Sequence, residues 1–90
     1  MLEIVRSGQF KRDVKLAGKR GQDMDKLRHV LELLVAGKPL PARYQDHPLK
    51  GDWAGFRDLH LAPDWLLIYR VHDEALELAR TGSHSDIFEG

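Results

Sequence analysis

Two amphipathic segments of helical period follow one another in residues 8–36, and they constrain the fold more than any other feature of the chain. In the first segment Phe10, Val14 and Ala17 fall on one face at helical spacing. The second carries a wider apolar arc, made by Met24, Leu27, Val30, Leu31, Leu34 and Val35. Two amphipathic helices joined by a short loop form a helical hairpin, whose apolar side needs a second layer to cover it.

That second layer is expected from alternating and near-continuous apolar runs in the other half of the chain. The expected elements are, in order, a strand over residues 2–6, a helix from Ser7-Gly8 to Lys19, a helix from an Asp23 N-cap to Ala36-Gly37, and strands over residues 56–61, 65–71 and 75–80. Residues 38–55 hold three prolines and two glycines and predict an ordered, non-helical loop. The order β-α-α-β-β-β predicts one α+β domain over residues 1–90, with a helical hairpin on a mostly antiparallel sheet and residues 65–71 at its centre.

Composition excludes several classes of protein. The chain has no cysteine, so disulfides, thiolate catalysis and cysteine-bound metals are excluded. No run approaches the roughly 20 apolar residues that a membrane-spanning helix needs. Residues 1–5 lack the basic and long apolar regions of a secretory signal, so a cytoplasmic location is expected.

The net charge of zero conceals an asymmetry between the two halves. Residues 1–50 hold 11 Lys and Arg against 6 Asp and Glu, whereas residues 51–90 hold 3 against 8. Four cations lie on one face of the first expected helix: Lys11, Arg12, Lys15 and Lys19. Charge alone favours a solvated helix surface here, with contact to a polyanion as the second interpretation.

Polar and aromatic side chains gather at loops and strand ends of the second half, where scaffolds usually present functional groups. They are His47, His60, Asp64, Trp65, Arg80, His84 and Phe88. Metal-free RNA cleavage needs a general base, a general acid and a cation beside the phosphate. Histidine suits both proton-transfer roles, arginine suits phosphate, and aromatic rings can stack on unpaired bases.

Ordinary structural roles compete with this interpretation. Taken singly, each of these residues is more often a loop-organising, turn or core residue than a catalytic one. A metal site formed by His60 and Asp64, with His47 or His84, is a weaker alternative, because their spacing straddles Pro63.

Three motifs in order carry a more specific signal: Asp46-His47-Pro48-Leu49, Pro63-Asp64-Trp65 and Arg80-Thr81-Gly82-Ser83-His84. Together with their spacing, which holds nearly end to end, they resemble the YafQ-type toxins of the RelE/ParE superfamily. The resemblance implies a RelE-like, microbial-RNase-like fold. It also implies a toxin that inhibits translation by cutting mRNA in the ribosomal A site, an endoribonuclease that uses neither metal nor cofactor.

The resemblance also implies roles for individual residues. His84 is expected to be the general acid, and His47, His60 or Asp64 to supply or orient the base. Arg80 would hold the scissile phosphate and Phe88 would position a base, with Trp65 nearby. The stripe formed by Lys11, Arg12, Lys15 and Lys19 becomes a contact for ribosomal RNA.

The implied partners are mRNA on the ribosome and a ribbon-helix-helix antitoxin of the DinJ type, with no membrane. Three alternatives remain open at this point. They are a ParE-like toxin that binds DNA gyrase without cleaving RNA, a ribonuclease that needs no ribosome, and a catalytically inactive relative.

Overall fold

A single five-stranded sheet runs through the computed structural model, which describes residues 1–89. The strands are β1 (Glu3–Arg6), β2 (His47–Pro48), β3 (Arg57–Ala62), β4 (Trp65–His72) and β5 (Ala75–Gly82). Their order is β1-β5-β4-β3-β2, with β1 parallel to β5 and the remaining pairs antiparallel. The predicted α+β fold and the central place of the fourth strand are therefore confirmed.

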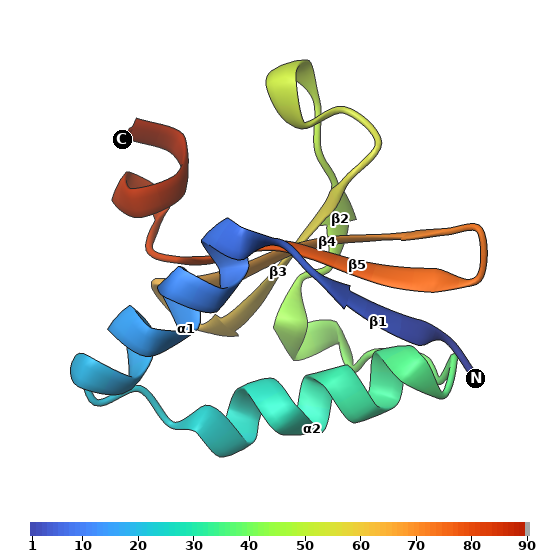
Figure 1. Ribbon diagram of the computed structural model, residues 1–90, viewed down its shortest axis with the longest axis horizontal. Coiled ribbons are helices and arrows are strands. Elements are labelled where there is room, and N and C mark those ends of the chain that lie inside the picture. Colours follow the sequence, from blue (N-terminus) through green and yellow to red (C-terminus); the bar gives the residue numbers. More distant parts are fainter. Residues whose placement is uncertain (90) are drawn as a thin grey trace.

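The two helices begin where their capping residues predict. Helix α1 (Gly8–Lys19) follows Ser7, whose hydroxyl accepts a hydrogen bond from the Phe10 amide. Helix α2 (Met24–Val35) follows Asp23, whose carboxylate accepts one from the Asp25 amide. Figure 1 shows the short connection between α1 and α2 at the edge of the molecule, with α2 running the length of the domain.

The central strand is apolar on both faces because each face meets its own cluster. Trp65, Leu67 and Tyr69 face the helices and belong to the main core. Leu66 and Ile68 face the opposite side. There they form a second, smaller cluster with Ile87 and with the partly buried Leu49, Trp53, Phe56 and Ala79. The second cluster supports the face on which the candidate site lies.

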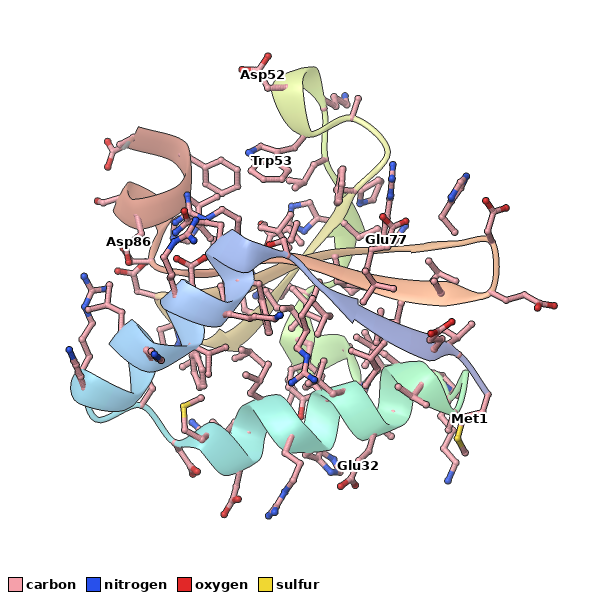
Figure 2. The ribbon with its side chains drawn as sticks, in the orientation of Figure 1. Met1, Glu32, Asp52, Trp53, Glu77 and Asp86 are labelled. Atoms are coloured by element: carbon pink, nitrogen blue, oxygen red, sulfur yellow. The ribbon has the colours of Figure 1, made fainter. Side chains whose placement is uncertain are left out.

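The loop over residues 38–55 is ordered, as its prolines and glycines predicted, but it is not free of helix. It contains two single-turn 3-10 helices, η1 (Ala42–Tyr44) and η2 (Gly51–Trp53), besides β2, so the expectation of a wholly non-helical loop was wrong. The buried Tyr44 anchors η1 in the main core. Figure 2 shows Trp53 pointing from η2 back toward the C-terminal end of the chain.

The described part of the chain ends in a short helix that the sequence did not predict, the π-helical turn η3 (Ser85–Glu89). Ile87 packs this turn onto the second cluster, and the sheet extends to Gly82, two residues beyond the expected strand end. No helix within residues 1–89 is both long and apolar enough to span a membrane.

Candidate active site

Three histidines and one phenylalanine form a row on the sheet face that is opposite the helices. The ring centre of His60 lies 6.5 Å from that of His47 and 5.7 Å from that of His84. The Phe88 ring follows at 6.2 Å from His84. His60 takes this face because side chains alternate along β3 and its neighbours Leu59 and Leu61 enter the main core. The fold therefore gathers four of the predicted residues from β2, β3 and the C-terminal segment.

His84 is held by Asp64. One oxygen of the Asp64 carboxylate accepts from the His84 amide at 3.1 Å and from its ring Nδ1 at 2.9 Å. These hydrogen bonds hold the pKa of Asp64 below its ordinary value. Because Nδ1 donates to Asp64, the Nε2 atom of His84 is left for the substrate. The structure thus links Asp64 to the expected acid, where the sequence interpretation linked it to the base.

His47 is oriented by its own loop. Its Nδ1 lies 2.8 Å from the Gln45 carbonyl oxygen, which can only accept, so Nδ1 carries a hydrogen and the lone pair of a neutral ring lies on Nε2. The backbone of Gln45, which carries this carbonyl, has a left-handed conformation with φ at 50°. Backbone strain of this kind is common at functional sites. Asp46 ties the loop to the sheet by accepting from the Tyr69 hydroxyl at 2.7 Å and from Arg57 Nε at 3.1 Å.

Asp58 is the residue of this site that the sequence interpretation missed. The residue is 4% exposed, and its carboxylate lies 3.7 Å from His47 Nε2 and has one oxygen without a hydrogen-bond partner among the described residues. Burial raises the pKa of Asp58, and the nearby His60, His47 and His84 oppose that rise. The available signal was its position: Asp58 and His60 are two residues apart on one strand and so share a face.

Arg80 is engaged within the fold. Its Nε and Nη2 atoms donate to the two oxygens of the buried Asp13 on α1 at 2.9 and 3.0 Å, and its Nη1 reaches the Asp86 carbonyl oxygen at 3.4 Å. Asp13 also accepts from the Thr81 amide. The guanidinium therefore joins α1, β5 and η3. The sequence interpretation expected the Arg80 guanidinium to be free to hold a phosphate. In the structure the Asp13 carboxylate already occupies it.

Trp65 corrects another expectation. The side chain is 1% exposed and lies in the main core, so it has no face on which an RNA base could stack. Its place as an RNA or ribosome contact was therefore wrong. Because Trp65 begins β4 at the centre of the sheet, its large apolar surface stabilises the fold.

A surface ion pair fixes the segment that carries His84 and Phe88. Arg20, just after α1, donates to the Asp86 carboxylate at 2.6 Å, and Figure 2 shows Asp86 at the base of η3, beside α1. The Arg20 hydrogen bond, followed by the Ser83 amide, lowers the pKa of Asp86 to about 2. This contact closes one end of the site.

The basic stripe is exposed as predicted. None of its four cations makes an ion pair with a carboxylate within residues 1–89: Lys11, Arg12, Lys15 and Lys19. A face of unpaired cations suits a polyanion. No group of three or more His, Asp or Glu side chains in the described part of the chain is arranged so that it could hold a metal ion.

Comparison with known proteins defines the class to which this fold and site belong. A family model described as the bacterial toxin of type II toxin–antitoxin systems, YafQ, matches residues 2–89. The mRNA interferase toxin YafQ of Escherichia coli K12 is 52% identical over 87 residues, which are 96% of this chain and 95% of that protein. The chain is therefore a toxin of a type II toxin–antitoxin system and belongs to the YafQ family. At this identity its enzyme class is that of its relative, an endoribonuclease.

Solved structures agree with this assignment. YafQ in the E. coli DinJ–YafQ complex superposes with a TM-score of 0.90 at 50% identity, covering 98% of this chain and 99% of that one. A metal-bound toxin from Helicobacter pylori superposes with a TM-score of 0.91 at 43% identity, covering 98% and 100%.

Proposed function

We propose that this toxin inhibits translation in the cytoplasm by cutting mRNA in the ribosomal A site, through acid–base catalysis that needs no metal ion. The row His47–His60–His84 carries the proposal, because a proton acceptor and a proton donor are each oriented by a separate partner. The carbonyl of Gln45 orients His47, and the carboxylate of Asp64 orients His84.

In the proposed step His47 Nε2 takes the proton of the ribose 2′-hydroxyl. The 2′-oxygen then forms a bond to phosphorus, and the bond from phosphorus to the 5′-oxygen breaks. His84 Nε2 delivers a proton to that leaving oxygen, so the products are a 2′,3′-cyclic phosphate and a 5′-hydroxyl end. Asp64 stabilises the charged His84 ring, as a carboxylate behind a catalytic histidine does in other enzymes.

His60 and Asp58 supply the charge balance between these two groups. His60 lies between His47 and His84, where a protonated ring stabilises negative charge on the phosphoryl oxygens. The buried Asp58 lies on the same side of the sheet, with its carboxylate 3.7 Å from His47 Nε2. Arg80 acts mainly through position, since its pairing with Asp13 holds the segment that presents His84. Phe88, 42% exposed, offers a ring on which a base can stack.

The exposed stripe of Lys11, Arg12, Lys15 and Lys19 supports a contact with ribosomal RNA, because these cations are free to displace counterions from phosphates. A ribbon-helix-helix antitoxin of the DinJ type is the proposed inhibitor. Support for this partner comes from the relative that is 50% identical and forms a complex with DinJ.

The test is cleavage of a defined mRNA during in vitro translation, with the cut sites mapped by primer extension. We expect the cuts to persist when EDTA has removed magnesium and a polyamine keeps the ribosome complexes assembled. The cuts should vanish with His84→Ala. Equal cleavage of the same RNA without ribosomes would replace the proposal by a free ribonuclease. No cleavage by the unmodified protein would favour the gyrase-binding alternative, which a supercoiling assay checks directly.

A further inference from the structure

An open groove of about 570 Å³ adjoins His60 and lies between β3, η1 and the first turn of α2. Lys26 and Arg43 line it together with Gln45, and none of its described lining residues is acidic. Neither cation pairs with a carboxylate within residues 1–89. The Arg43 guanidinium instead lies over the Tyr44 ring, 5.0 Å from its centre, and donates to the Tyr44 hydroxyl.

Two residues belong both to this groove and to the row of histidines. His60 lines the groove, and its Nδ1 is buried without a hydrogen-bond partner among the described residues. Gln45 also lines it and holds His47 through its carbonyl. The groove is therefore continuous with the site, and its position is set by the same strained turn.

The second hollow beside the site has the opposite character. It has a volume of about 500 Å³ and is lined by three carboxylates, those of Asp13, Asp64 and Asp86, against one cation, Arg20, which is already paired with Asp86. Phosphates are repelled by such a lining and attracted by unpaired cations. A strand whose scissile phosphate lies at His60 is covalently continuous, so its next phosphates lie beside the site, and of these two hollows the groove of Lys26 and Arg43 has the charge that suits them.

We infer that the groove of Lys26 and Arg43 is a subsite for the ribose-phosphate backbone of the RNA strand next to the cleaved bond. The inference rests on the proposed function and extends it to the path of the substrate. Lys26 and Arg43 neutralise phosphates there, and the contact with the Tyr44 ring orients the Arg43 guanidinium.

The experiment measures binding of an uncleavable probe, a 12-nucleotide single-stranded RNA with 2′-O-methyl riboses, by fluorescence anisotropy across a salt series. The variant Lys26→Gln/Arg43→Gln is compared with the unmodified toxin and with Arg6→Gln/Lys38→Gln, which removes the same charge from exposed positions outside the groove. Circular dichroism checks that all three proteins melt alike.

For the groove variant we expect about tenfold weaker binding at low salt and a slope of log Kd against log salt that is smaller by about 1.4, because each phosphate contact on a single strand contributes ~0.7. The control variant should keep the unmodified slope. Equal slopes for the groove variant and the unmodified toxin would overturn the subsite, as would no binding by the unmodified toxin at low salt. An unchanged slope with weaker inhibition by antitoxin would assign the groove to an acidic antitoxin segment.

Cleavage on programmed ribosomes separates this inference from the function on which it rests. The groove variant should need a higher toxin concentration for half-maximal cleavage, while its maximal rate stays within about twofold, since the histidines are untouched. A lower maximal rate with unchanged half-maximal concentration would contradict a binding subsite. Failure of the unmodified toxin to cut mRNA on ribosomes would refute the proposed function and leave the anisotropy result to stand by itself.

Discussion

One oxygen of the Asp64 carboxylate accepts hydrogen bonds from both the amide and the ring Nδ1 of His84. The two residues are 20 positions apart, and Asp64 lies in the turn between β3 and β4 while His84 follows β5. The contact fixes the ring orientation and directs Nε2 away from Asp64. It is the feature that distinguishes His84 from the other histidines of the row.

Asp64→Asn should therefore reduce cleavage without removing it. An amide keeps the shape of the carboxylate but loses the charge that stabilises the protonated ring, so we expect roughly a 10- to 1,000-fold lower single-turnover rate on ribosomes. His84→Ala should lower the rate at least as far, and the double variant no further than His84→Ala alone. If the double variant lost cleavage rate by the product of the two single-variant factors, the two residues would act independently.

Asp58→Asn should stabilise the protein while it slows the reaction. The pKa of Asp58 is raised by burial, so the ionised form destabilises the fold at all pH values above that raised pKa. Removing the charge should raise the free energy of unfolding by about 1 kcal/mol at pH 7, or roughly 4–8 °C in Tm. This gain should disappear as the pH falls below 3.8, the ordinary value.

The measurement for Asp58→Asn combines thermal melts at pH 7 and pH 3.5 with ribosome-dependent cleavage. Asp52→Asn, on the exposed η2 turn, serves as a control for loss of one negative charge. A lower Tm at pH 7 for Asp58→Asn would show that this carboxylate is stabilised by its histidine neighbours after all.

Asp86→Asn tests the contact that holds the C-terminal turn. Its folded pKa of about 2 lies below the ordinary 3.8, so the carboxylate stabilises the fold above about pH 4 and loses that effect as the pH falls through 2. The pair is partly exposed, so we expect Tm at pH 7 to fall by no more than about 4 °C. Cleavage should fall more noticeably, since His84 and Phe88 flank this residue.

The control for Asp86→Asn is Asp25→Asn, which removes an exposed ion pair with Arg28 at the start of α2. Hydrogen exchange of residues 83–88 should quicken in Asp86→Asn and not in the control. Unchanged exchange together with unchanged cleavage would show that Ile87 packing alone secures the turn.

Charge reversal on the basic stripe should weaken ribosome binding and leave the fold intact. Lys11→Glu and Lys15→Glu lie on the exposed face of α1, away from the core residues Phe10 and Ala17. Sedimentation with ribosomes across a salt series should show weaker association and a smaller salt dependence. Lys38→Glu/Lys50→Glu, with the same change of charge elsewhere, should bind as the unmodified toxin does, and equal binding by the stripe variant would refute the contact.

Local chemistry explains how much of the fold could be predicted. Ser7 and Asp23 begin the helices because their side chains satisfy free amides, and the unbroken apolar run of β4 predicts a buried central strand. The conformation of the loop over residues 38–55 was harder to predict, because the η1 turn depends on Tyr44 reaching a core that is built from distant residues. The η3 turn likewise depends on Ile87 and on Arg20.

Within the site, the sequence by itself determined the kinds of groups available: three histidines, their neighbouring carboxylates and an aromatic ring at strand ends. Tertiary structure alone decided their pairing, because hydrogen bonds and ion pairs between residues far apart in sequence depend on strand register and helix docking. Register brought Asp58 beside His47 and the turn of Asp64 beside His84. Docking of α1 paired Arg80 with Asp13, a contact between residues 67 positions apart that no pattern of neighbours along the chain could have specified.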